Sequence, residues 1–492
     1  MSAANSGDPG PETLRAARVD GAVVDLTLAG GLITAIRPHE PGPGLDLGGR
    51  TVVPGLWDNH VHFDQWALAR QRLDLSAVGS AAEAVALVAA RLRTAPPAEG
   101  VLVGAGFRDG LWPDAPRLDL LDAASPGVRV VLVSGDLHCC WLNSAAAAHY
   151  GIAPEPSGVV REQDWHPIME DVRRAADLDR YAAEAARAAA ARGVVGIVDF
   201  EAPFPLDAWR SRIAAGSRSL RVVSSVWPPA LSQALERGAR TGDAVPDTDG
   251  LLTMGPLKIV TDGSLNTRTA FCVDPYPGLE GTAHPCGMVL VAPSELVPLL
   301  ERATEGGLDV AVHAIGDAAN AFVLDAFAAT GARGRVEHAQ LLQHADVPRF
   351  AALGIVASVQ PEHAVDDRDV ADHYWAGRTG RAFVFRSLLD AGAALALGSD
   401  APVAPLDPWV AIAAAVHRSG DDRAPWHPEQ QVTLAEALAA SWGPDGPLRE
   451  GRRADLAILD ADPATCTPTG LREMPVAATM LGGAWTHRLA WP

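Results

Sequence analysis

The chain has 492 residues, 48% of them hydrophobic and 20% charged, which is the balance of a globular protein with a large core. Its formal net charge of −20 argues against nucleic acid and anionic membranes as partners, and it contains no long apolar run that would span a membrane. The five cysteines follow no C-x-x-C spacing, and Met1 to Glu12 contains no apolar signal-peptide region. We therefore expect a cytoplasmic protein with a small-molecule substrate, and leave a homodimer as an open alternative.

Short apolar runs separated by glycines mark the two ends of the chain. They predict small β-structure over residues 17–53, 454–459 and 477–480. We expect these ends, residues 1–54 and 404–492, to form one composite β-sandwich together with late helices.

Between the two ends, predicted strands alternate with predicted helices. The strand candidates are residues 51–61, 194–199, 220–226, 257–260, 310–313, 335–338, 355–359 and 394–398. Helical segments, including residues 318–329 and 346–353, separate most of them. Eight strands with helical crossovers predict a (β/α)8 TIM-type barrel over residues 55–403.

The gap between the first two predicted strands is far too long for a single crossover. Residues 64–192 should therefore hold an inserted subdomain. A capping box from Ser80 to Glu83 predicts the start of one helix in it, and a second box from Thr433 to Glu436 predicts a later helix.

Polar side chains stand at or near the ends of five predicted strands. They are His60, His62, Lys258, His313, His338 and Asp400. Alternate residues of a strand face the same way, so His60 and His62 can point into one site. Active sites of TIM barrels are built at the carboxyl ends of the strands, so all six side chains are expected to converge there.

The chemistry of this set favours a metal site. Four imidazoles, one amine and one carboxylate suit Zn²⁺ or a similar divalent cation. Lys258 is the only lysine among the 40 lysines and arginines, which suggests that arginine cannot replace it. Each residue alone also fits a simpler role: His313 or His338 in the core or a loop, Asp400 in a turn, and Lys258 reaching solvent from a strand end.

Eight segments, in order along the chain, resemble one group of enzymes. They are VVPGLWDNHVH (52–62), WLNS (141–144), TDGSL (261–265) after Lys258, VHAIGD (312–317), VEHAQ (336–340), SVQP (358–361), LGSDAPV (397–403) and GRRADL (451–456). Together they resemble the amidohydrolase superfamily, and within it the amidohydrolase-3 group of YtcJ-like metal-dependent hydrolases. The sequence departs from the group at Cys139 and Cys140 and at Asn266.

The resemblance implies a barrel joined to a β-sandwich made from both termini. It implies that His60, His62, His313, His338 and Asp400 bind one or two divalent ions, with zinc as the first choice. It also implies that Lys258 is carboxylated by CO₂ and bridges two ions as a carbamate. A protonated ammonium would be repelled by a neighbouring cation, which supports a neutral or modified Lys258.

Four further residues are candidates for substrate binding. Arg268 follows the fourth predicted strand and is predicted to pair with a substrate carboxylate, although a surface ion pair is an equal alternative. His363 follows the seventh strand, while His138 and Trp141 lie in the insertion, and we assign all three to the pocket.

The predicted activity is hydrolysis of a C–N bond, of amide or N-substituted formamide type and outside peptides, by metal-activated water. Asp400 carries the proton from the water to the leaving amine. His60 and His62 would hold one ion and His313 and His338 the other, with Lys258 between them. Alternatives in the same site are cyclic-amide opening, deamination and ester hydrolysis, and a non-catalytic small-ligand binding protein is the alternative of another class.

Overall fold

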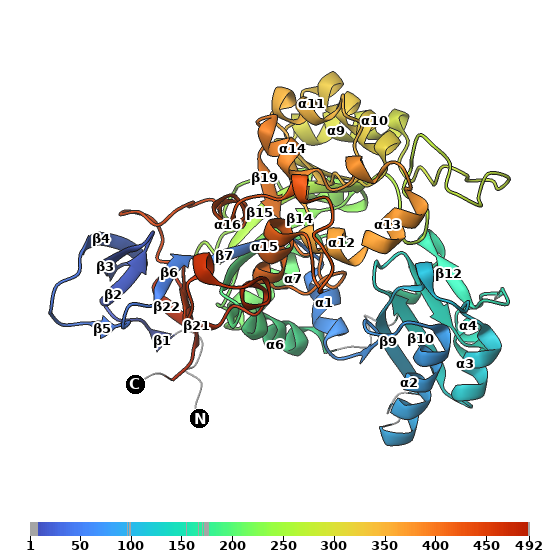
Figure 1. The fold of residues 1–492 in the computed structure, drawn as a ribbon, viewed down its shortest axis with the longest axis horizontal. Helices are drawn as coiled ribbons and strands as arrows, with labels where there is room; N and C mark the ends of the chain where they lie inside the picture. The colour runs from blue at the N-terminus through green and yellow to red at the C-terminus, as the bar shows by residue number, and fades with distance from the viewer. Residues whose placement is uncertain are drawn as a thin grey trace.

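The computed structural model describes residues 8–490, apart from residues 96, 98–99, 154, 166, 170 and 172–176. The prediction that Met1 to Glu12 contains no signal-peptide region falls largely on residues 1–7, which lie outside the described part. Figure 1 shows a central barrel covered by helices, a β-sheet built from both ends of the chain, and an insertion with its own sheet and helices. The two described chain ends lie side by side beneath the terminal sheet.

Eight parallel strands form the barrel, which confirms the predicted fold class. In barrel order they are β7 (Leu56–Val61), β13 (Val194–Asp199), β14 (Arg221–Val226), β15 (Leu252–Val260), β16 (Val310–Ala314), β17 (Gly334–His338), β18 (Val356–Val359) and β19 (Leu395–Leu397). The barrel closes after β19, where the backbone N–H of Asp400 donates to the carbonyl of His60 (2.7 Å) and that of His62 donates to Ala401 (2.8 Å). A side chain at Gly398 would lie 2.6 Å from the His60 nitrogen, so glycine permits this closure.

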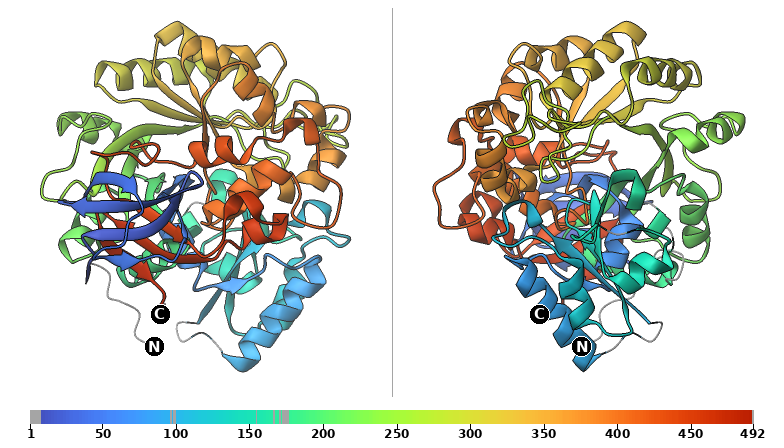
Figure 2. Two further views of the ribbon diagram at one scale, coloured as in Figure 1. Left: turned by 60° about the vertical axis from the view of Figure 1, so that its left-hand side comes forward. Right: turned by 90° about the vertical axis from the view of Figure 1, so that its right-hand side faces the viewer.

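Helices cover the outside of the barrel and most connect successive strands (Figure 2). The longer helices are α6 (Leu178–Ala190), α7 (Leu206–Ala214), α9 (Pro293–Glu305), α10 (Asp317–Thr330) and α15 (Pro408–His417). Shorter ones are α1 (Phe63–Ala69), α8 (Leu231–Glu236), α11 (Val347–Leu353), α12 (Pro361–Asp366), α13 (Arg368–Tyr374), α14 (Phe385–Asp390), α16 (Leu434–Ala440) and α17 (Pro468–Arg472), and of all these α15, α16 and α17 follow the last barrel strand. The strand residues are almost all buried because they face the barrel interior on one side and these helices on the other.

The predicted helix starts agree with the structure. At α16, Thr433 and Glu436 make the reciprocal capping box. At α2 (Ala81–Thr94), the Ser80 hydroxyl accepts from the Glu83 backbone N–H at 3.1 Å, whereas the Glu83 carboxylate accepts from Gly79 rather than from Ser80.

The terminal sheet has nine strands drawn from both ends of the chain. They are β1 (Asp8–Pro9), β2 (Thr13–Val19), β3 (Ala22–Ala29), β4 (Leu32–Pro38), β5 (Leu45–Asp46), β6 (Thr51–Pro54), β20 (Leu456–Leu459), β21 (Val476–Leu481) and β22 (Ala484–Arg488). The two ends join where β6 pairs antiparallel with β20.

The run 51–61, interpreted as one strand, divides at Gly55. Thr51–Pro54 belongs to the terminal sheet and Leu56–Val61 to the barrel. A side chain at Gly55 would lie 2.4 Å from Val195, so the chain changes sheet where only glycine fits.

The insertion between β7 and β13 contains a five-stranded sheet with helices beside it. Its strands are β8 (Leu73–Asp74), β9 (Val101–Phe107), β10 (Arg129–Ser134), β11 (Cys139–Leu142) and β12 (Val159–Arg161), and its helices are α2, α3 (Leu118–Ala124) and α4 (Ser144–His149). This unit has its own apolar core, which includes Trp141 and Phe107. Across the described residues, none of the helices has the length and apolar character needed to cross a membrane.

Candidate metal centre and active site

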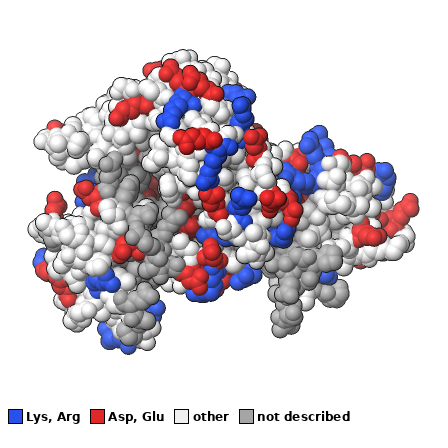
Figure 3. Space-filling view, turned by 180° about the vertical axis from the view of Figure 1, so that it is seen from behind, with Lys and Arg blue, Asp and Glu red and all other residues white. Residues whose placement is uncertain are grey.

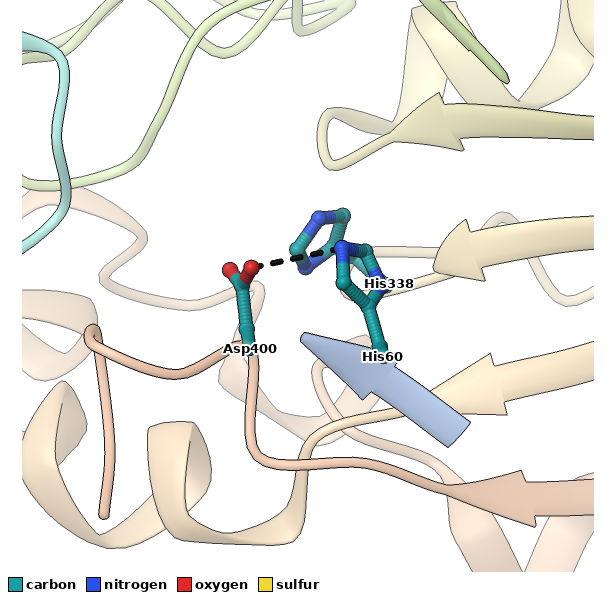
Figure 4. Close-up of side chains that lie close together, drawn as sticks. All are labelled: His60, His338 and Asp400. Atoms are coloured by element: carbon teal, nitrogen blue, oxygen red, sulfur yellow. Dashed lines mark ion pairs between the residues drawn. The ribbon is translucent and has the colours of Figure 1, made fainter. Parts of the chain in front are cut away.

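The structure brings the six predicted metal-site residues together at the carboxyl ends of the barrel strands. The most compact group is His60, His338 and Asp400, whose ligand atoms all lie within 4.8 Å of one another. Figure 4 shows these three side chains converging from β7, the end of β17 and the loop after β19. The strand ends therefore do converge as the sequence pattern indicates.

Asp400 lies close to both His60, in β7, and His62, just after the end of this strand. Its Oδ1 is 3.3 Å from His60 Nε2 and 3.4 Å from His62 Nε2. Asp400 adopts a left-handed backbone conformation with φ of 57°, which turns the chain sharply at this strand end. Burial opposes its charge, but the neighbouring imidazoles of His60, His62 and His338 hold the pKa of Asp400 well below its usual range.

Glu337 fixes the protonation of His60. Its Oε2 is 2.6 Å from His60 Nδ1, and both side chains are fully buried. Burial alone would raise the pKa of Glu337, but Arg335 and His60 hold it far below its usual range. The carboxylate can therefore only accept, so the proton sits on His60 Nδ1 and the lone pair on Nε2.

This protonation leaves two electron-rich atoms facing each other. His60 Nε2 carries a lone pair and lies 3.3 Å from the anionic oxygen of Asp400. A second proton does not resolve the conflict, because burial and the neighbouring Lys258 lower the pKa of His60 to about 4. A cation shared by the nitrogen and the carboxylate does resolve it, which is one reason why the site fits a metal ion.

Lys258 stands near the carboxyl end of β15 with 1% of its surface exposed. Its Nζ is 3.5 Å from His60 Nε2 and 4.6 Å from the centre of the Phe200 ring. Burial lowers the pKa of Lys258 to about 8, which gives an appreciable neutral fraction at neutral pH. A neutral amine is the form that can bind a metal ion or react with CO₂.

His313 and His338 form the opposite side of the group. Their ring centroids are 4.4 Å apart, and His338 lies 5.1 Å from the His60 ring. His313 Nε2 is 3.4 Å from Asp262, whose carboxylate also accepts from the backbone N–H groups of Ile315 and Gly316. Burial lowers the pKa of both histidines, so both imidazoles are neutral, as metal ligation requires.

The remaining polar atoms support the same interpretation. His62 Nδ1 and His338 Nδ1 are buried with no hydrogen-bond partner in the described part of the chain. Within this group of imidazoles, such nitrogens are compatible with a partner from outside the polypeptide. Neutral imidazoles, a carboxylate and a buried amine are a donor set that fits Zn²⁺ and similar divalent ions.

Sequence analysis did not single out Glu337. In β17 it stands directly before His338, and consecutive strand residues normally face opposite sides. Here His338 has φ of 72° and Ala339 has φ of 44°, so the strand turns at its end and both Glu337 and His338 reach the interior. The available signal was the acidic residue directly before a histidine in the short strand GRVEH, two positions after Arg335.

A cavity of about 480 Å³ lies over the six residues and is the space available to a substrate. His138 and His363 line it, as predicted for substrate-binding residues. His138 lies across from the barrel, 6.2 Å from the His313 ring, and His363 stacks on His338 at 6.0 Å.

Two other predicted pocket residues do not line this cavity. Trp141 is fully buried in the core of the insertion, because β11 pairs with β10 and turns this side chain away from the barrel. Arg268 has φ of 59°, and its guanidinium lies 5.4 Å from the centre of the Tyr374 ring. Cys139 and Cys140 are likewise buried inside the insertion, whereas Asn266 does line the cavity.

The fold and the site together define a (β/α)8-barrel protein with a candidate metal centre at the carboxyl ends of its strands. Residues 44–487 match the amidohydrolase family, and the chain belongs to this family. The members of this family are hydrolases.

Three curated relatives are similar over most of their length. Protein LONG AFTER FAR-RED 3 of Arabidopsis thaliana is 30% identical over 85% of this chain and 79% of its own. The putative amidohydrolase YtcJ of Bacillus subtilis is 29% identical, and the N-substituted formamide deformylase of Arthrobacter pascens is 28% identical, each over 89% of both chains. An uncharacterized metal-dependent hydrolase from Pyrococcus horikoshii has the same fold, with a TM-score of 0.77, 24% identity and coverage of 93% of this chain and 99% of that one.

Proposed function

We propose that this protein hydrolyses a C–N bond in a small molecule, of amide or N-substituted formamide type and outside peptides, with water activated by a divalent metal ion. The observation that carries the proposal is the group of His60, His338 and Asp400, whose ligand atoms converge at the base of a substrate-sized cavity. The similarity to an N-substituted formamide deformylase supports the choice of bond.

We assign His60 and His62 to one metal position and His313 and His338 to a second, with Asp400 beside the first. Zinc is the first choice of metal, because nitrogen ligands predominate. A bound divalent ion would lower the pKa of water to about 7 and polarise a carbonyl group. Glu337 would keep His60 in the tautomer whose Nε2 faces the ion, as carboxylates behind metal-bound histidines do.

Asp400 is the proposed proton carrier. The pKa of Asp400 lies well below its usual range, so its carboxylate is ionised at neutral pH. It can accept the proton of the attacking water at one oxygen and donate that proton to the leaving nitrogen. Its position at the base of the cavity, 3.3 Å from His60 Nε2, places this oxygen beside the proposed ligands.

Lys258 is the proposed bridging residue after reaction with CO₂. The product is an anionic carbamate, an oxygen ligand that arginine cannot provide. The lowered pKa of the buried amine supports the assignment, because only the neutral amine reacts. His363 and His138 are the proposed hydrogen-bonding residues for the substrate, since both line the cavity beside the histidine group.

The test is a substrate panel with the zinc-reconstituted protein. The panel contains N-alkyl and N-aryl formamides, the matching acetamides, lactams, aminopyrimidines and carboxylic esters. We expect release of the free amine from the formamides or acetamides, and loss of that release in Asp400→Asn. Turnover confined to lactams, esters or aminopyrimidines would replace the proposed reaction with another one in the same site. Metal binding without turnover of any compound would favour a non-catalytic binding protein.

A further inference from the structure

The cavity has a second region beyond the metal-facing residues, formed by the insertion and by loops of the barrel. Apolar side chains supply most of it, among them Met169, Trp227, Pro228, Leu265 and Val291. The indole N–H of Trp227 donates to the carbonyl of Phe200 at 3.0 Å. Its polar atom is therefore already used, and the ring offers the cavity an apolar face.

One guanidinium lies in this second region, and acidic groups surround it. Arg108 donates to Asp366 at 2.8 Å and to the carbonyl of Val403 at 2.8 Å, and lies 3.8 Å from Asp367. Although burial opposes it, these carboxylates and Asp136 raise the pKa of Arg108 above its usual value. The positive charge is therefore already neutralised within the protein.

Asp136 adds a negative charge to the same wall. It accepts from the hydroxyls of Ser134 at 2.6 Å and Ser264 at 2.7 Å and from the backbone N–H of His138 at 3.2 Å. Burial would raise the pKa of Asp136, but His138 and these hydrogen bonds hold it below its usual value. Asp136 thus remains an anion on the cavity wall, and its own partners hold it in place.

Arg268, which the sequence analysis predicted to pair with a substrate carboxylate, does not lie in this second region. Arg268 is outside the lining of the cavity, with its guanidinium over Tyr374. Among the described lining residues away from the metal-facing group, two carboxylates, those of Asp136 and Asp367, accompany one guanidinium, that of Arg108, and the imidazoles of His138 and His363 lie in the same lining. A carboxylate placed there would lose water and meet like charges without a free cation.

We propose that this wall selects substrates whose group beyond the scissile bond is apolar and uncharged, an aryl or alkyl substituent, and rejects substrates that carry a carboxylate there. Selection among substrates rests on the proposed amide hydrolysis. The binding preference does not depend on that reaction, because it is a property of the cavity wall. N-acyl amino acids and dipeptides, which carry a carboxylate near the amide, belong to the rejected class.

The test measures binding with compounds that cannot be hydrolysed. Three matched ketones replace the amide: 4-phenylbutan-2-one, its para-carboxamide and its para-carboxylate. Calorimetric titration of the metal-loaded wild-type protein should give at least about tenfold weaker binding for the carboxylate than for the carboxamide of the same size. Equal or tighter binding of the carboxylate would overturn the proposal. The result is independent of turnover, so failure of amide hydrolysis is detected separately in the substrate panel.

A matched pair of variants locates the preference on the wall. Val291→Arg places a free cation on the cavity lining, whereas Val289→Arg places the same residue two positions away, at a 40% exposed site outside the lining. The carboxylate penalty should shrink at least about fivefold in Val291→Arg and persist in Val289→Arg. Metal content and carboxamide binding confirm that each variant is folded. A penalty unchanged in a folded Val291→Arg protein would contradict the proposal, and the wild-type ranking decides it if that variant does not fold.

Discussion

The two ends of the cavity are built in different ways. At the metal-facing end, His60, Lys258 and Glu337 stand on barrel strands and are almost fully buried, and His60 contacts both of the others. At the opposite end the wall comes from the insertion and from loops, and apolar faces such as that of Trp227 are only partly covered. The metal-facing end, built on barrel strands, fixes the chemistry, and the end built from loops can change substrate preference without disturbing it.

The charged side chains on the surface agree with the acidic composition. On the face shown in Figure 3, the basic and acidic side chains of the described residues are interspersed and form no continuous basic patch. The chain as a whole is acidic, with a net charge of −20.

The largest predicted effect comes from removing the first pair of histidines. His60→Ala combined with His62→Ala should lose most of its bound metal and at least about 10³-fold of its activity, because metal activation is worth several kcal/mol. Elemental analysis and amine release measure the two effects. A double variant with wild-type metal content would show that these residues are not ligands.

Asp400→Asn tests whether catalysis at the metal-facing end can be lost while metal binding is kept. The amide keeps the size of the side chain and one oxygen ligand but removes the base. Activity should fall by about 10²–10⁴-fold while most metal remains. The measurements are kcat, metal content and the melting temperature. Unchanged kcat with metal bound would exclude Asp400 as the base, whereas loss of metal and fold together would make it chiefly a structural ligand.

Lys258→Arg tests the bridging role. It keeps a positive charge but cannot form a carbamate, so it should lose most of its activity. Lys258→Ala is the companion variant, because a short carboxylic acid such as acetate, added with zinc, should restore part of its activity by occupying the vacated position. Near-wild-type turnover in Lys258→Arg would rule out the carbamate.

Glu337→Gln should lower the affinity for the metal, because Glu337 contacts His60 and not the substrate. Loss of a carboxylate behind a metal-bound histidine costs about 10–100-fold in metal affinity or activity, measurable by chelator competition. Because folding lowers the pKa of Glu337, its stabilisation is present above the ordinary pKa of 4.5 and is lost as the pH falls. The unfolding free energies of wild type and Glu337→Gln should therefore converge in acid. Unchanged zinc affinity would show that Glu337 serves the fold alone.

The smallest effect is expected at the opposite wall. Trp227→Ala removes one aromatic face, worth on the order of 1 kcal/mol, and should raise KM for an aryl amide about fivefold with metal content unchanged. Steady-state kinetics with an aryl and a methyl amide make the comparison, because the methyl compound should be nearly insensitive. A fall in bound metal would show that the two ends are not independent.

The sequence predicted the metal-facing end of the cavity better than the opposite wall. Strand ends follow from hydrophobic runs, so His60, His62, His313, His338 and Asp400 could be placed on one rim by counting strands. Partners across the barrel depend on register and on local turns, which explains why Glu337 escaped notice: its contact with His60 joins residues 277 positions apart.

The wall could not be derived from sequence because loops and insertions lack a repeating pattern. Trp141 stands in a family-like motif and Arg268 shortly after one, yet the pairing of β11 buries the first and a left-handed turn directs the second toward Tyr374. Arg108 and Asp136, which carry the charge of the wall, come from strand ends of the insertion whose position over the barrel is a tertiary property.

Removal and restoration of the metal test the central claim most directly. The protein is stripped with a chelator, dialysed, and titrated with zinc, while metal content and amine release from an N-aryl formamide are followed on the same samples. Release should be absent in the stripped protein and should rise in proportion to bound zinc until the site is filled. A metal-free protein that releases amine at the full rate would contradict the account.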